Sequence, residues 1–227
     1  MTQRYLNMKK FEACIFDLDG VIVDTATYHY KAWKRLANEM GFDLTEKQNE
    51  QLKGVSRMKS LDILLQIGNV TLSDKEKAKQ AERKNQWYRA YIKEMKPEDI
   101  FAGTLQLMDE LKREKIKIAI GSASKNAQTI IDQIKIESYL EAIVDGKKIS
   151  RAKPDPEIFL MAAKELKVSP ENCIVFEDAW SGIQAANNAG MTSIGVSDKK
   201  NLSEANYVIK GLHEINLSIL KNIFYKK

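Results

Sequence analysis

Two aspartates, Asp17 and Asp19, stand two residues apart at the end of a short apolar run and are followed at once by Gly20. The run Ala13–Phe16 predicts a buried strand that delivers both carboxylates at its C-terminal end, where parallel sheets bind ligands. Carboxylates so close together need a cation or separate roles. We consider Asp17 a metal ligand and nucleophile, and Asp19 an acid–base group; an ordinary Asp/Gly turn is the alternative.

A second pair of acids ends another apolar run. Glu177 and Asp178 follow Cys173–Phe176, which also predicts a buried strand. Adjacent carboxylates at the tip of a strand are suitable ligands for a hard divalent cation. An acidic N-terminal cap for a helix starting near residue 180 explains the pair equally well.

Two further strand ends carry groups that bind phosphate. Ser122-Ala123-Ser124-Lys125-Asn126 follows the apolar run Ile116–Ile120, and its hydroxyls and the amides of the next helix could hold an anion. Lys153, fixed beside Pro154, could neutralise a phosphate. Taken singly, a capping serine and a solvated lysine are the simpler readings. The order carboxylate pair, hydroxyl, lysine, carboxylate pair, each at a strand end, favours one shared site.

The elements that position these groups alternate from Pro97 onward. Apolar strand runs at Ile116–Ile120, Ala142–Val144, Cys173–Phe176 and Ser193–Val196 are separated by segments with helical signals. The helices are expected over residues 125–135, after the cap Asp155, and after the cap Ser181. Strands alternating with helices predict an α/β fold: a Rossmann-like parallel sheet with helices on both faces.

The segment between about residues 25 and 95 contains helical patterns and no strand run. Thr45 with Gln48 and Ser73 with Glu76 are capping-box signals, and Gly41 suits the end of an earlier helix. The fold therefore includes an inserted all-helical cap domain. We expect residues 1–23 and 96–227 to form the α/β core, with 1–7 a disordered extension, and residues 24–95 to form the cap. The two connections are a natural hinge.

Composition excludes several classes of protein. The chain has 227 residues, 30% of them charged, and a net charge of +5. Its lysines are interleaved with acids, as solvated helix faces are, so we expect no nucleic-acid partner. It has no apolar run of membrane-spanning length and no signal-peptide pattern, so we expect no membrane and a cytoplasmic location. Cys14 and Cys173 are expected to be buried, inert thiols.

These motifs, in this order, resemble the haloacid dehalogenase superfamily of phosphotransferases and, more narrowly, the β-phosphoglucomutase family. The resemblance extends from about residue 8 to 200, whereas the tail around Ile215–Phe224 carries no motif that we recognise. It departs from the family at Met58-Lys59, where acidic residues are expected, and at Ala179, where some relatives carry a hydroxyl residue. The residues that carry it are Asp17–Ile22, Thr25, His29, Trp33, Glu50–Arg57 and Ser122–Asn126.

The resemblance implies a role for each core residue. Asp17 would become an aspartyl phosphate, and Asp19 would act as the acid and then the base. Mg²⁺ would be held by Asp17, Asp178 and the carbonyl of Asp19, with Glu177 in support. The transferring phosphoryl group would be bound by Ser122, Ala123 and Lys153.

The resemblance also implies a second phosphate site and a sugar pocket. Ser124, Lys125, Asn126 and Arg57 would bind the other phosphate of a bisphosphate. His29 and Lys53 would couple closure of the cap to catalysis. The sugar pocket would be lined by Gly54 and Val55, and Thr25 is placed in the same substrate site.

The implied activity is a Mg²⁺-dependent phosphomutase. It would interconvert β-glucose 1-phosphate and glucose 6-phosphate through glucose 1,6-bisphosphate, and a monomer is the default state. A sugar-phosphate or phosphoglycolate phosphatase is the closest alternative, since only Arg57, residues 53–55 and residues 124–126 favour the mutase. A non-catalytic binding protein would lack the nucleophile or the lysine, and both are present.

Overall fold

The computed structural model describes residues 10–52, 56–197 and 202–226. The chain forms two compact units, one from Met1–Asp24 and Lys96–Lys227 and the other from Thr25–Met95. Asp24 groups with the first unit. The predicted extension 1–7 and the predicted pocket residues Lys53, Gly54 and Val55 lie outside the described residues. No helix in the described ranges has the length and apolar character that crossing a membrane requires.

The first unit is built on a parallel sheet. Within the described residues it has six strands in the order β3-β2-β1-β4-β5-β6, and every neighbouring pair is parallel. The chain winds to one side of β1 and then to the other, so β1 and β4 flank the point where the strand order reverses, which is where such sheets bind ligands. The strands are β1 Ala13–Phe16, β2 Lys117–Gly121, β3 Ala142–Val144, β4 Cys173–Glu177, β5 Thr192–Val196 and β6 Tyr207–Ile209.

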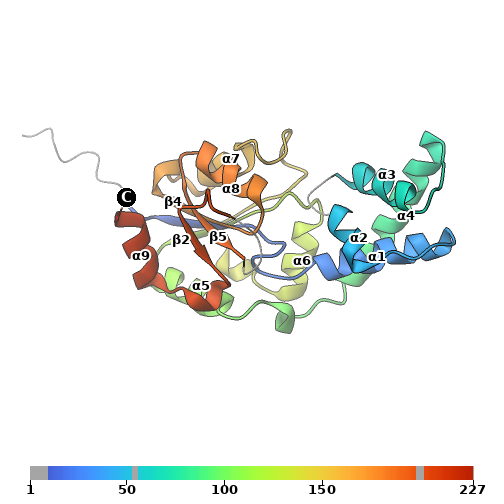
Figure 1. The fold of residues 1–227 in the computed structure, drawn as a ribbon. Helices are drawn as coiled ribbons and strands as arrows, with labels where there is room; N and C mark the ends of the chain where they lie inside the picture. The colour runs from blue at the N-terminus through green and yellow to red at the C-terminus, as the bar shows by residue number, and fades with distance from the viewer. Residues whose placement is uncertain (1–9, 53–55, 198–201, 227) are drawn as a thin grey trace, which may run out of the picture. The chain divides into compact units, whose positions relative to one another are not determined.

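Helices cover both faces of this sheet, as Figure 1 shows for α7 and α8 on one face and α5 and α9 on the other. Apolar side chains of α7 and α8 pack against alternate residues of the central strands, including Ile15 and Val175. On the opposite face Phe16 and Phe176 stack with ring centres 4.6 Å apart. The α/β prediction is confirmed. The helices of this unit are α5 Thr104–Arg113, α6 Ala127–Ile134, α7 Glu157–Leu166, α8 Trp180–Asn188 and α9 Leu217–Tyr225.

The second unit contains helices and no strand within residues 25–52 and 56–95. They pack around one apolar cluster that includes Trp33, Leu36, Leu61 and Leu64. Thr45 and Ser73 both form the predicted capping boxes. The helices are α1 Ala26–Glu39, α2 Glu46–Asn49, α3 Arg57–Ile67 and α4 Asp74–Ile92.

Two predicted helix starts in the first unit are wrong. The helix expected after Ser181 begins at Trp180, with Ala179 at the N-cap position. The amide of Ala179 donates to Glu177 Oε2 at 2.7 Å, so a carboxylate at the strand end replaces the serine. The helix expected after Asp155 begins at Glu157, although the Asp155 carboxylate still accepts from the Glu157 amide at 3.0 Å.

The capping box at the start of α4 gives a stability prediction. Ser73 Oγ accepts from the Glu76 amide, and Glu76 Oε2 accepts from the Ser73 amide at 2.8 Å. Ser73→Ala is expected to lower the free energy of unfolding by about 1 kcal/mol in urea denaturation. The control is Ser169→Ala, because Ser169 is exposed and its side chain makes no capping hydrogen bond within the described part of the chain. Equal losses in the two variants would contradict the prediction.

Candidate active site

The two aspartates at the end of β1 have different surroundings. Asp17 is buried, and its Oδ2 accepts a hydrogen bond from the amide of Asp19 at 2.9 Å. Gly20 follows with φ of +92°, a conformation that glycine adopts without strain. A Cβ at Gly20 would lie 2.6 Å from the carboxyl carbon of Asp178, so only glycine lets this turn approach the end of β4 so closely. The acids of β1 and β4 therefore belong to one site.

Lys153 joins these two strands from the loop before α7. Its Nζ donates to Asp17 Oδ1 at 2.5 Å, to Glu177 Oε1 at 2.7 Å and to the carbonyl of Gly121 at 3.2 Å. The lysine side chain and both carboxylates are almost fully buried. The sequence predicted Lys153 as a phosphate ligand, but it did not indicate this bridge between Asp17 and Glu177.

Charges in the group shift the pKa values of its members. Burial raises the pKa of Asp17 well above its ordinary value; the charge of Lys153 opposes this, and Glu177 and Asp19 add to it. Burial lowers the pKa of Lys153, but Asp17 and Glu177 outweigh it and hold that pKa above its ordinary value. The Lys153 ammonium contacts two carboxylates, and both stabilise its charged form. Lys153 is therefore charged at neutral pH. Acids still outnumber it, which favours a further cation.

Glu177 is fixed on both of its oxygens. Oε1 accepts from Lys153 and Oε2 accepts from the amide of Ala179 at the start of α8. A Cβ at Gly182 would clash with the Glu177 carboxylate, so this glycine gives the acid its space. Glu177 therefore orients Lys153 and the first turn of α8.

The loop between β2 and α6 supplies the hydroxyl groups. Ser122 is fully buried, and its Oγ donates to Asp19 Oδ2 at 3.3 Å and accepts from the amide of Ser124 at 3.1 Å. Ser124 Oγ accepts from the amide of Asn126 at 3.2 Å. A Cβ at Gly146 would clash with the Ala123 carbonyl, so the loop rests directly on the chain after β3.

The structure thus brings the predicted core residues together. Asp17, Asp19, Ser122, Lys153 and Glu177 form one hydrogen-bonded group, and Asp178 lies against its glycine turn. Ala123, Ser124, Lys125 and Asn126 belong to the adjoining loop.

Oxygen atoms of this group fit a hard divalent cation. Within the described ranges, no three acidic, histidine or cysteine side chains are already arranged as a metal site. The Lys153 ammonium lies between Asp17 and Glu177. Asp17, Asp178 and the backbone carbonyl of Asp19 provide the all-oxygen donor set that Mg²⁺ prefers. These residues could hold the ion while Glu177 keeps Lys153 in place.

The helical unit carries a buried lysine that the sequence analysis did not identify. Lys84 is 2% exposed, and its Nζ lies 2.7 Å from Nδ1 of His29 and 4.4 Å from the centre of the Trp33 ring. Burial and the charge of Arg57 lower the pKa of Lys84 to about 7. Its spacing in the sequence could have indicated burial, because Lys84 precedes Tyr88 by four residues on the buried face of α4.

His29 contacts this lysine from α1. Its ring stacks on Tyr88 with centres 3.9 Å apart. Surrounding protein, Lys84 and Arg57 together lower the pKa of His29 well below its ordinary value. The His29 side chain keeps contact with solvent, so we attribute the lowered pKa to the charge of Lys84 more than to burial. A neutral His29 can accept from Lys84 at Nδ1, which assigns its ring proton to Nε2.

Arg57, at the start of α3, is partly exposed and pairs with a carboxylate of its own unit. Its Nη1 donates to Glu82 Oε2 on α4 at 3.4 Å. Thr25 is buried and stands at the N-cap position of α1. The helical unit therefore brings two cationic side chains, Arg57 and Lys84, together with the neutral ring of His29.

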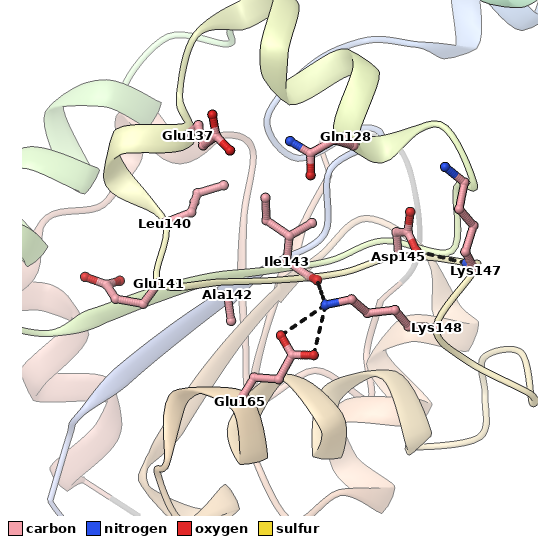
Figure 2. Close-up of a pocket in the computed structure, with 10 residues that line it drawn as sticks. All are labelled: Gln128, Glu137, Leu140, Glu141, Ala142, Ile143, Asp145, Lys147, Lys148 and Glu165. Carbon is pink, nitrogen blue, oxygen red and sulfur yellow. Dashed lines mark hydrogen bonds and ion pairs between the residues drawn. The ribbon is translucent and has the colours of Figure 1, made fainter.

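A separate groove of about 460 Å³ follows the outer edge of the sheet at β3. Figure 2 shows Lys148 reaching across it to the carbonyl of Ile143 and to Glu165, at distances of 2.6 Å and 2.9 Å. Because the Lys148 ammonium bonds a backbone carbonyl of the edge strand β3, it hinders pairing of that strand with another chain. The groove therefore marks a protected edge of the sheet, and none of the predicted catalytic residues lines it.

Comparisons with known proteins agree with this geometry. A family model described as haloacid dehalogenase-like hydrolase matches residues 14–196. The chain is 41% identical to a β-phosphoglucomutase of Bacillus subtilis over 92% of this chain and 93% of that protein. It is 31% identical to a phosphorylated carbohydrates phosphatase of Thermotoga maritima over 93% of this chain and 99% of that protein.

A solved structure supports the same conclusion. The crystal structure of a β-phosphoglucomutase from Clostridium difficile aligns with a TM-score of 0.85 and 45% identity, covering 95% of this chain and 98% of that one. The chain therefore belongs to the haloacid dehalogenase-like hydrolase family and, within it, to the branch of the β-phosphoglucomutases.

Proposed function

We propose that this protein is a phosphomutase that interconverts β-glucose 1-phosphate and glucose 6-phosphate through an aspartyl phosphate and glucose 1,6-bisphosphate. One observation carries the proposal. Two carboxylates on a single turn have separate partners: Asp17 contacts the Lys153 ammonium, and Asp19 contacts the Ser122 hydroxyl. A nucleophile and an acid–base group need such different environments. The similarity to the two β-phosphoglucomutases supports the choice of sugar.

The mechanism follows from these positions. An oxygen of Asp17 attacks phosphorus, the new bond to the carboxylate forms, and the bond from phosphorus to the sugar oxygen breaks. Asp19 gives its proton to that leaving oxygen and later takes a proton from the other hydroxyl of the sugar, which attacks the aspartyl phosphate. Lys153 and the amides and hydroxyls of the loop that begins at Ser122 neutralise and orient the transferring oxygens.

Magnesium is the cofactor that this donor set fits. Asp17, Asp178 and the carbonyl of Asp19 would hold it, and it would supply further neutralisation of the phosphoryl oxygens. Glu177 would keep the Lys153 ammonium beside Asp17 when the ion is bound.

A phosphatase is the second candidate, because a relative 31% identical to this chain is named a phosphorylated carbohydrates phosphatase. The core residues would serve both reactions. Arg57 and Lys84 on the helical unit favour the mutase, because its bisphosphate intermediate has a second phosphate for them to bind, whereas hydrolysis of a sugar monophosphate needs no such group.

A single assay separates the two activities. Purified protein with Mg²⁺, β-glucose 1-phosphate and a trace of glucose 1,6-bisphosphate is expected to form glucose 6-phosphate with little free phosphate. Asp17→Asn removes the nucleophile at nearly constant size, so it is expected to lose both the aspartyl phosphate and turnover. Free phosphate released in step with substrate loss would identify a phosphatase. A normal acid-labile phosphoenzyme in Asp17→Asn would falsify the assignment of the nucleophile.

Arg57 is expected to separate mutase activity from core chemistry. Arg57→Ala removes a charged contact to the distal phosphate, so the mutase kcat/KM should fall about 10- to 100-fold. Phosphorylation of Asp17 by acetyl phosphate, which has no distal phosphate, should be unchanged. The control is Arg89→Ala, because Arg89 pairs with the same Glu82 at 3.3 Å. Equal losses in both activities of Arg57→Ala would refute the role.

Lys84 is expected to titrate near pH 7, because burial lowers its pKa to about that value. His29 from α1 and Arg57 from α3 face it. Its charge is therefore present below pH 7, where it favours anion binding, and lost above. The KM for the bisphosphate should rise as pH passes upward through 7, and this rise should be absent in Lys84→Met. A Lys84 ¹³Cε signal that shifts near pH 7, assigned by its absence in Lys84→Met, gives an independent readout. A signal constant up to pH 9 would refute the prediction.

A further inference from the structure

Glu82 is the acid that contacts Arg57 in the described part of the helical unit. Its Oε2 accepts from Arg57 Nη1 at 3.4 Å, and its Oε1 lies 3.3 Å from Arg89 Nη2. Each carboxylate oxygen therefore takes one guanidinium. Two oxygens offered to arginine nitrogens are what a phosphate would offer at the same place.

The surroundings of Glu82 are otherwise cationic. Arg57 is near enough to lower the pKa of both Lys84 and His29, so these three groups share one region of the unit. An anion at Arg57 is favoured by the charge of that guanidinium and by the charge of protonated Lys84. Glu82 partly cancels this field at the arginine that the bisphosphate would need.

The contact between Glu82 and Arg57 is weak enough to be exchanged. The two side chains are 49% and 38% exposed, and a single nitrogen–oxygen contact joins them. Exposed pairs of this kind contribute little to stability, because water screens them. A phosphate dianion carries more charge than a carboxylate and can contact the guanidinium through two oxygens. The phosphate would therefore displace Glu82.

We propose that Glu82 is a positioning residue that competes with the distal phosphate of the bisphosphate for Arg57. It holds Arg57 when the site is empty and lowers the affinity for the bisphosphate. The intermediate can then dissociate, or reorient to present its other phosphate to Asp17, more readily. The inference rests on the proposed function, because it requires a substrate with two phosphates.

Binding is measured in the Asp17→Asn background, where the bisphosphate cannot react. The Kd of glucose 1,6-bisphosphate is determined by calorimetry with and without Glu82→Gln, which removes the charge and keeps the size. We expect the affinity to increase about two- to five-fold, and the increase to shrink at high salt. The matched control is Glu39→Gln, since Glu39 also pairs with two arginines of this unit, Arg35 and Arg83.

Two readouts separate competition from a general change of charge or folding. The gain from Glu82→Gln should disappear when Arg57→Ala is also present, because the competition acts through that arginine. With Asp17 intact, Glu82→Gln should lower both KM for the bisphosphate and kcat, while phosphorylation by acetyl phosphate stays constant.

The possible outcomes distinguish failure of this inference from failure of the proposed phosphomutase function. Equal affinity gains in Glu82→Gln and Glu39→Gln, or a gain that survives Arg57→Ala, would overturn the competition. Weaker binding in Glu82→Gln would also overturn it and would show that Glu82 aligns Arg57 for phosphate. If Arg57→Ala alone leaves bisphosphate binding unchanged, the proposed second phosphate site itself is wrong.

Discussion

The rest of the site depends on one buried interaction, the Lys153 ammonium between the carboxylates of Asp17 and Glu177. Two acids at the ends of neighbouring strands would repel each other inside the protein, and burial makes each charge costly unless it is paired. Lys153 relieves both acids and ties the loop before α7 to β1 and β4. Loss of either partner would leave an uncompensated buried charge. The same arrangement puts a cation beside the carboxylate that we propose to attack phosphorus.

The parallel sheet makes this interaction possible. β1 and β4 are adjacent and in register from Ala13 with Cys173 to Phe16 with Phe176, so their carboxyl ends deliver Asp17 and Glu177 side by side. Close approach then requires small residues at defined points. Gly20 leaves room for Asp178, and Gly182 leaves room for Glu177. The apolar faces of the sheet fix the backbone, so the side chains have little freedom to separate.

The two units hold their charges differently, and the difference matches their proposed roles. At the candidate active site of the α/β unit, the ion pairs of Lys153 with Asp17 and Glu177 are buried, which suits groups that must keep one geometry through a reaction. In the helical unit Arg57 and Glu82 form an exposed single contact, and Lys84 has a pKa of about 7. Such groups change partner or charge at small cost, which suits a site that must bind a phosphate and then release it.

The sequence alone determined the elements and the order of the motifs, and the tertiary structure decided how the side chains pair. Strand β1, the capping boxes at Thr45 and Ser73, and the helical segment could be predicted because they depend on neighbouring residues. The contact between Lys153 and Asp17 spans 136 positions, and the contact between Lys84 and His29 spans 55. No local pattern encodes such distances, because packing of the whole chain creates them. The predicted cap at Ser181 was wrong although the contact that replaces it is local: Glu177 accepts from the amide of Ala179 two residues further on, while Lys153 holds its other carboxylate oxygen.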